Sequence, residues 1–112
     1  MKPPRAETRF VVLHHTGWGQ EHLDLMIEPA PGAQKLHTWR VPCWPLRDGV
    51  RLTPLGEHRR EYLEYEGPVS GGRGEVRCVA RGLCAISSGA EGAVRVKFED
   101  EEWLLSDVAR RG

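Results

Sequence analysis

The sequence predicts an all-β fold: a small antiparallel β-barrel that contains at most one or two short helices. First, apolar residues recur with a period of two, which is typical of half-buried strands. Second, 13 glycines and 8 prolines interrupt the 112 residues at short intervals. Third, no segment carries a long apolar pattern with the 3.6-residue period of a helix. Short strands separated by frequent turns favour an antiparallel barrel or sandwich.

Alternation identifies the strand candidates. In "HLDLMIE" at 22–28, the apolar residues at odd positions share one face, and His22 and Asp24 share the other. In "AVRVKFE" at 93–99, valine and phenylalanine alternate with charged residues. The candidates in chain order are 10–15, 22–28, 35–41, 49–53, 74–80, 93–99 and 103–106.

Turn residues separate these candidates, and one segment predicts a helix. Clusters of glycine, proline, aspartate and serine mark breaks in the chain. The segment "GEHRREYLEY" at 56–65 is the one place where a short helix is expected. The predicted breaks are 30–34, 47–49, 67–74, 80–82 and 87–92.

The length of the chain fits one domain, which we expect to span 1–112 with flexible ends at 1–8 and 109–112. No apolar run approaches the 18 or so residues of a transmembrane helix. The first residues, "MKPPRAETR", lack the apolar stretch of a signal peptide. We therefore expect a cytoplasmic protein that has no membrane partner.

Net charge gives no indication of nucleic-acid binding, and the cysteine content argues against disulfide frameworks and cysteine-based metal sites. The formal net charge is zero, so the total does not by itself indicate nucleic-acid binding. The three cysteines, Cys43, Cys78 and Cys84, form no C-x-x-C motif. This predicts reduced thiols rather than a disulfide framework or a cysteine-based zinc site.

Two histidines and an aspartate form a candidate metal site. His22 and Asp24 are two residues apart on a predicted strand, so they share a face. If the first two strand candidates pair as a hairpin, His15 lies beside His22, whereas His14 points to the opposite face. Two imidazoles and one carboxylate suit Mn²⁺, Fe²⁺ or Zn²⁺ with open positions for water or substrate. Spacing alone leaves open the alternative that these are ordinary surface or capping histidines.

Four blocks then occur in a fixed order: "RFVVLHH", "HLDLMIE", "HTWRVP" and "EHRREYLEYEGPVSGGRGEV". Together they resemble the 3′-phosphoesterase domain of bacterial DNA ligase D and its stand-alone relatives. That family reads F-V-V-x-x-H, H-x-D-x-x-x-E, W-x-V-P, and H-x-x-x-Y followed by E-G-x-x-x-x-G-x-G. The resemblance covers roughly residues 9–80.

The resemblance implies a compact β-barrel that holds Mn²⁺ on its concave face, with Zn²⁺ or another divalent ion as alternatives. The implied activity is hydrolytic processing of 3′ ends in DNA repair: removal of a 3′-terminal ribonucleoside and then of the 3′-phosphate. Implied partners are nucleic acid 3′ ends, in primer–template DNA or an RNA/DNA hybrid. A ligase or polymerase of an end-joining system is a further expected partner.

Residue by residue, the resemblance matches His15, His22 and Asp24 to the metal ligands. It also implies a catalytic set at the phosphate, in which the arginine is matched by allowing a one-residue gap. This set is His58, Tyr62 and Arg51.

Two positions depart from the family pattern. Met26 stands where an arginine is usual, and Cys43 stands where a lysine is usual. Each missing cation near a phosphate typically costs a few kcal/mol of transition-state stabilisation. The alternative function is therefore a catalytically weakened member of the same fold, which serves as a nucleic-acid or partner-binding module. A third interpretation, a metal-dependent oxygenase barrel, depends only on the two histidines and one carboxylate.

The glycine-rich segment and one tryptophan carry two further predictions. The glycines at 71, 72 and 74 predict a β-turn or bulge rather than a phosphate-binding loop, because no G-K-[ST] and no helix follow. Trp18 lies in the loop between the proposed ligand strands, so it is a candidate nucleic-acid contact.

Overall fold

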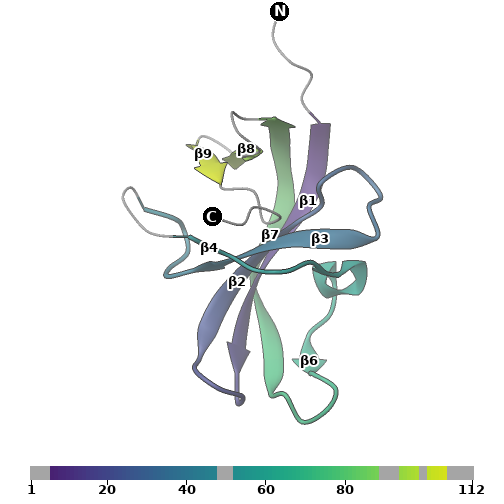
Figure 1. Cartoon of the computed structure of the whole chain (residues 1–112), viewed down its shortest axis with the longest axis vertical. Coiled ribbons are helices and arrows are strands. Elements are labelled where there is room, and N and C mark those ends of the chain that lie inside the picture. The colour runs from purple at the N-terminus through teal and green to yellow at the C-terminus, as the bar shows by residue number, and fades with distance from the viewer. Residues whose placement is uncertain (1–5, 48–51, 89–93, 99–100, 106–112) are drawn as a thin grey trace, which may run out of the picture.

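The computed structural model describes residues 6–47, 52–88, 94–98 and 101–105. The strands form an antiparallel sheet that curls into a half-barrel, in the order β4-β3-β2-β1-β7-β8-β9 (Figure 1). Strand β5 pairs with β3, and β6 pairs with β7. The elements are β1 Ala6–Thr16, β2 His22–Ile27, β3 Lys35–Val41, β4 Thr53–Pro54, β5 His58–Arg59, the 3₁₀ helix η1 Arg60–Leu63, β6 Gly67–Pro68, β7 Glu75–Ser88, β8 Val94–Phe98 and β9 Glu101–Leu105.

The predicted all-β, barrel-like fold is confirmed. Within the described part of the chain the longest helix is η1, with four residues, which is shorter than the helix expected in 56–65. No helix within this part is long and apolar enough to cross a lipid bilayer. Of the strand expected at 49–53, the structure describes only the last two residues; Leu52 is not in a strand, and β4 is confined to Thr53–Pro54.

Two strands are longer than predicted. Strand β1 begins at Ala6, before the predicted strand 10–15 and inside the expected flexible end at 1–8. The turn predicted at 80–82 is wrong, because β7 runs through it to Ser88 while pairing with β1 along its length. Glycine is tolerated there because Gly82 lies opposite Phe10, whose ring covers it. The predicted ends at 1–5 and 109–112 lie outside the described residues.

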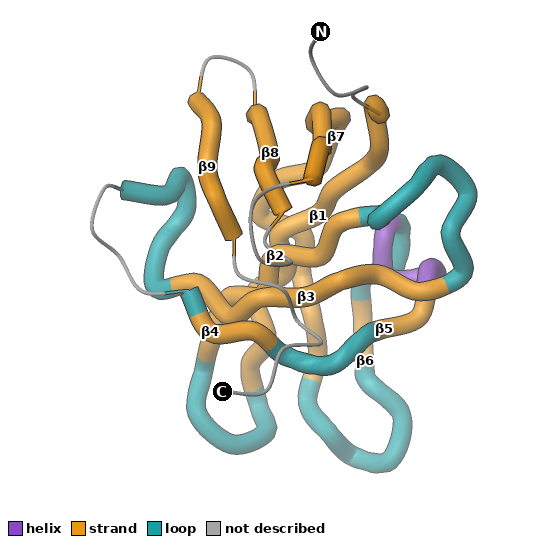
Figure 2. Tube along the Cα trace, turned by 45° about the horizontal axis from the view of Figure 1, so that its top comes forward, coloured by secondary structure: helices purple, strands orange, loops and turns teal. Residues whose placement is uncertain are grey.

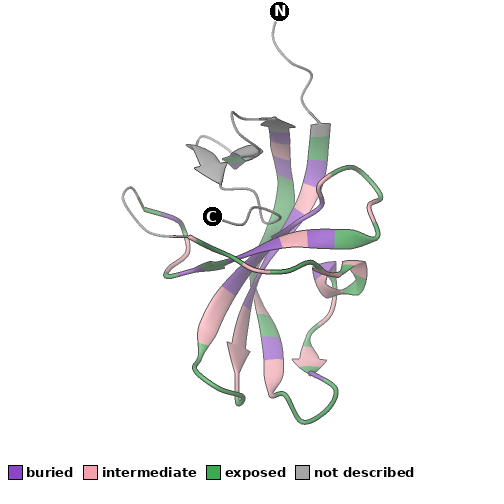
Figure 3. Ribbon diagram, in the orientation of Figure 1, coloured by how far each residue is buried: buried purple, intermediate pink, exposed green. Residues whose placement is uncertain are grey.

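The sheet buries apolar side chains on both of its faces. Strand β1 contributes Phe10 and Val12 to one core cluster and Val11 and Leu13 to the other, as alternation requires. Strand β8 contributes Val96 and Phe98 to the first cluster, and η1 contributes Leu63 to the second. Figure 2 shows β8 and β9 at one end of the curled sheet, apart from η1. Buried residues accordingly follow one another along the middle of β1 instead of alternating with exposed ones (Figure 3).

A bulge in β7 moves its even-numbered residues from the face of one core cluster to the face of the other. Val12 pairs with Ala80 and Leu13 pairs with Cys78, which leaves Val79 as the extra residue. Cys78 therefore packs against the cluster that contains Leu13, whereas Ala80 and Cys84 pack with the cluster that contains Val12. Burial raises the pKa of the Cys84 thiol to about 11, although a hydrogen bond with Thr8 opposes this. The thiol is thus protonated at neutral pH.

A buried carboxylate fastens the end of β2 to three other segments. Glu28 is 2% exposed and accepts hydrogen bonds from the backbone N–H groups of Arg9 (2.7 Å) and Gly32 (3.0 Å). It also pairs with the guanidinium of Arg60 at the start of η1. Burial acts to raise the pKa of Glu28, but these hydrogen bonds outweigh it and lower the pKa below 4.5. Glu28 therefore acts as a structural anion.

Candidate metal centre

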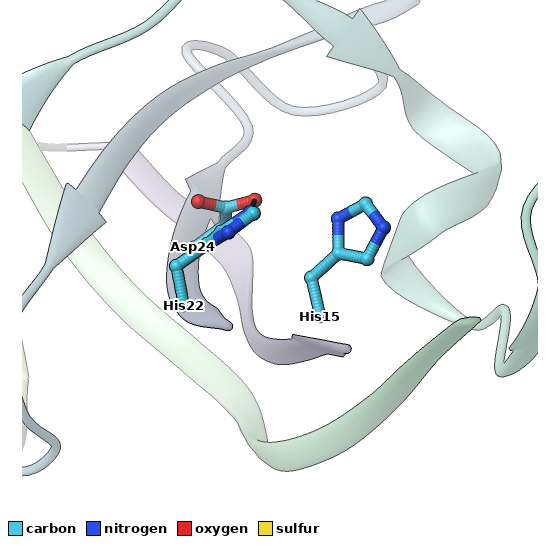
Figure 4. Close-up of side chains that lie close together, drawn as sticks. All are labelled: His15, His22 and Asp24. Carbon is cyan, nitrogen blue, oxygen red and sulfur yellow. Dashed lines mark ion pairs between the residues drawn. The ribbon is translucent and has the colours of Figure 1, made fainter. Parts of the chain in front are cut away.

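The strand pairing brings together the three residues that the sequence singles out as metal ligands. In the antiparallel β1–β2 ladder, His15 lies opposite His22, and Leu13 lies opposite Asp24, as the predicted hairpin requires. The imidazole rings of His15 and His22 have centroids 4.9 Å apart. One donor atom from each of His15, His22 and Asp24 lies within 4.8 Å of the others. Their side chains lie on one face of the β1–β2 hairpin, with the His15 ring facing Asp24 and His22 (Figure 4).

Backbone carbonyls fix the tautomers of both histidines. His15 Nε2 lies 2.7 Å from the carbonyl oxygen of Arg73, and His22 Nδ1 lies 2.8 Å from that of Gln20. A carbonyl can only accept, so each of these nitrogens carries the proton, and in a neutral ring the other nitrogen has a free lone pair. Figure 4 shows that His15 directs its second nitrogen toward Asp24. Carbonyl-oriented imidazoles of this kind are usual around protein-bound metals.

Asp24 is buried with an incomplete set of hydrogen bonds. The residue is 5% exposed, and its Oδ1 has no hydrogen-bond partner among the described residues. Its Oδ2 lies 3.2 Å from His22 Nε2, which is the lone-pair nitrogen of that ring in its neutral form. Two acceptors at this distance repel each other unless they share a cation. That cation is either a proton on His22, which makes an ion pair, or a metal ion.

The spacing of the donors suits a divalent ion. Nitrogen and carboxylate oxygen bind Zn²⁺ at about 2.0–2.2 Å, so two neighbouring ligands of a tetrahedral ion are about 3.4 Å apart. The three donor atoms lie within 4.8 Å of one another, so the side chains would close by about 1 Å around an ion. Three protein ligands leave coordination positions open, as in catalytic rather than structural sites. The donor set and the orphaned oxygen together fit a metal ion.

A cavity of about 180 Å³ adjoins these donors. Its lining includes His58 and Tyr62, two of the residues that the sequence resemblance implies at the phosphate. Their rings are in edge-to-face contact, with centroids 6.1 Å apart. His58 Nδ1 lies 2.9 Å from Thr38 Oγ1 and 3.2 Å from the carbonyl of Gly56, so Nδ1 carries the proton. In the neutral ring, Nε2 is then the basic nitrogen. The third residue of the predicted set, Arg51, lies outside the described residues.

Two arginines supply positive charge to the same cavity. Arg40 lies opposite Asp24 in the β2–β3 ladder, with Nε 4.0 Å from Asp24 Oδ1. Arg73 also lines the cavity, and its guanidinium donates to Ser70. Met26, where the family has arginine, is 3% exposed and belongs to the adjoining core cluster. Cationic side chains are thus present at the site, but from other positions.

The predicted glycine turn proves to have a second role. Residues 69–74 connect β6 to β7 by a turn, as expected. The backbone of Gly74 packs so closely against the β1–β2 loop that a Cβ there would lie 2.1 Å from the Thr16 carbonyl oxygen. This contact brings the Arg73 carbonyl to His15. Sequence reasoning missed it, and the only available signal was the density of glycines in this loop.

His14 serves as an internal comparison for His15. It lies on the other face of β1, pairs with exposed Glu21 and lines a different groove of about 480 Å³. His22 and Arg40 border both hollows. The choice of His15 over His14 as the partner of His22 follows from strand alternation and agrees with the register.

Comparison of the chain with protein-family models and with curated proteins finds no match, so the site itself has to carry the functional assignment.

Proposed function

We propose that this protein is a Mn²⁺-dependent 3′-phosphoesterase-like domain that processes 3′ ends of nucleic acid. The reaction class is hydrolysis, in which a 3′-terminal ribonucleoside and then a 3′-phosphate are removed. The observation that carries the proposal is the buried Asp24 oxygen that has no hydrogen-bond partner among the described residues, beside the lone-pair nitrogens of His15 and His22. The resemblance of the four sequence blocks supplies the substrate class.

In this proposal, His15, His22 and Asp24 hold the ion, which when bound supplies charge neutralisation and an acidified water. His58 uses Nε2 to accept a proton, or in its protonated form to donate one to a phosphate or leaving-group oxygen. The Thr38 hydroxyl and the Gly56 carbonyl hold the ring so that Nε2 is the nitrogen available for this. Tyr62 fixes the other side of the His58 ring and offers a phenol as a hydrogen-bond donor.

Arg40 is the cation best placed to bind a phosphate in this proposal. Its guanidinium borders both the small cavity and the larger groove, and its side chain is 46% exposed, so it can turn toward a ligand. A guanidinium can bind two phosphate oxygens at once. Phosphoryl chemistry depends mainly on positioning and charge, so a cation from β3 can act where the family uses one from β2.

The direct test is end processing by the purified protein in the presence of Mn²⁺. The substrates are labelled primers that end in a 3′-phosphate or in a single 3′-ribonucleotide. We expect conversion to a 3′-OH end, loss of activity in His22→Ala and His58→Ala, and full activity in the matched control His14→Ala. Metal binding that is confirmed by a thermal shift, without any processing of either primer, would refute the phosphoesterase proposal.

A second candidate is the weakened, binding-only domain, and the burial of Met26 favours it. A methionine that packs into the core at this position places no charge near the phosphate. The double change Met26→Arg and Cys43→Lys separates the candidates. A large gain of activity from an inactive parent would support the binding-only domain, whereas an active parent would exclude it.

A further inference from the structure

Trp18 is an exposed aromatic side chain beside the candidate metal centre. It lies in the loop between β1 and β2, is 53% exposed and lines the same cavity as His15 and His58. Among the described residues, Val79 and Leu83 are the other large apolar side chains with comparable exposure. Only Trp18 of these three borders the cavity that holds the ligand set.

One face of the Trp18 indole makes an offset stacking contact with a metal-ligand candidate. The rings of His15 and Trp18 have centroids 6.2 Å apart, and their planes are inclined by 24°, so they are nearly parallel. A ring that is stacked on one side and half exposed overall presents its second face to a ligand. The indole therefore extends the metal site with a flat apolar surface.

The backbone that carries Trp18 is held in place. Gly17 and Gly19, on either side of it, have φ values of 83° and 66°, which favour glycine. The backbone of Gly74 packs against the same loop, and a Cβ on Gly74 would lie 3.0 Å from the backbone nitrogen of Trp18. An exposed ring on a fixed backbone binds a flat ligand with little further loss of entropy.

We propose that the open face of Trp18 stacks on the nucleobase next to the reacting phosphate. The proposal rests on the proposed function for the class of substrate, and it adds the base as a recognised part of the substrate. Stacking on an aromatic side chain tolerates every base, because each has a π face. A base that stacks on Trp18 is separated from its neighbours, so the preferred substrate is an unpaired or frayed 3′ end.

Binding of a labelled single-stranded DNA with a 3′-OH end tests this without turnover. We expect Trp18→Ala to weaken binding by about 10-fold, Trp18→Phe to bind within about 3-fold of the parent, and Leu83→Ala to bind normally. Leu83 is a suitable control because it is 57% exposed and lies opposite Arg9, near the other end of β1. DNA should also quench tryptophan emission in the parent more than in Trp18→Phe.

An abasic nucleotide identifies the base that is bound. Two strands are compared, one without the terminal base and one without the penultimate base. The parent and Trp18→Ala should have equal affinity for the strand that lacks the base bound by Trp18. An unchanged affinity of Trp18→Ala, or an equal loss on intact and both abasic strands, would overturn the stacking site. Base-dependent binding without end processing rejects the phosphoesterase proposal alone, and processing without a Trp18 effect rejects the stacking site alone.

Discussion

Substitution of Asp24 by asparagine separates a metal ligand from a structural ion pair. Asn has nearly the same shape but carries no charge, so it weakens any bond to a cation. Asp24 Oδ1 has no hydrogen-bond partner among the described residues, and the nearest guanidinium, that of Arg40, is 4.0 Å away and half exposed. Such a contact contributes little. If the cation shared by Asp24 and His22 is a metal ion, the metal-free carboxylate faces the lone pair of His22 Nε2. We therefore expect metal-free Asp24→Asn to be within about 1 kcal/mol of the parent, because the asparagine amide can donate a hydrogen bond to that nitrogen.

Bound metal should stabilise the folded parent protein, and its concentration relative to the Kd sets the size of this stabilisation. An ion present at 100 times its Kd stabilises the folded state by about 2.7 kcal/mol. A chain of 112 residues has an unfolding entropy that converts 1 kcal/mol into about 4 °C in Tm. Mn²⁺ at that concentration should raise the Tm of the parent by about 10 °C. The rise should disappear in Asp24→Asn.

The protein is first treated with a chelator. Thermal unfolding with and without added Mn²⁺ then measures the metal-free stability and the metal-dependent rise in Tm. His14→Ala is the matched control, since His14 lies on the opposite face, and it should keep the full metal-dependent shift. A loss of about 3–5 kcal/mol in metal-free Asp24→Asn, as expected for one partner removed from a buried ion pair, would refute the role of Asp24 as a metal ligand. An undiminished metal shift in Asp24→Asn would refute it equally.

Three further outcomes are expected. Gly74→Ala should lower the affinity for Mn²⁺ by about 10–100-fold, because the added methyl displaces the loop whose carbonyl orients His15; isothermal titration measures this. Arg40→Ala should reduce kcat/KM on 3′-phosphate ends by about 10–100-fold, with little change in Tm. Glu28→Gln should lower the free energy of unfolding by about 2 kcal/mol at pH 7, less than for a fully buried pair, because its partner Arg60 reaches solvent. Because the pKa of Glu28 is lowered in the folded protein, its stabilisation is present above pH 4.5 and declines as the pH falls below that value; urea unfolding across pH measures this.

The substitutions of Gly74 and Glu28 each have a control within the chain. Gly72 also has a positive φ, but no heavy atom lies within 4 Å of an added Cβ, so Gly72→Ala should leave metal affinity unchanged. Glu64 forms an exposed pair with Arg9, so Glu64→Gln should show no loss at pH 7. Equal effects of Gly72→Ala and Gly74→Ala would contradict the role of the close contact. A pH-independent difference between Glu28→Gln and the parent would contradict the assigned charge of Glu28.

The local pattern of the sequence was sufficient for the fold class and for much of the hairpin. Side-chain alternation depends only on neighbouring residues, so it predicted the strands at 22–28 and 35–41 and the common face of His22 and Asp24. The extent of β1 and β7 was not predicted. Their length depends on mutual pairing, which allowed β7 to pass through the apparent turn at 80–82 and to change faces at Val79.

At the site, the sequence alone determined which residue types could meet: His15 beside His22, and Asp24 two residues on, within a hairpin. Tertiary structure alone decided how they are held. The Arg73 carbonyl that fixes His15 is 58 positions away along the chain. The burial that leaves an Asp24 oxygen without a hydrogen bond from the described residues depends on packing from several strands. Such contacts join residues that are remote in sequence, so no local pattern encodes them, whereas strand alternation is encoded residue by residue.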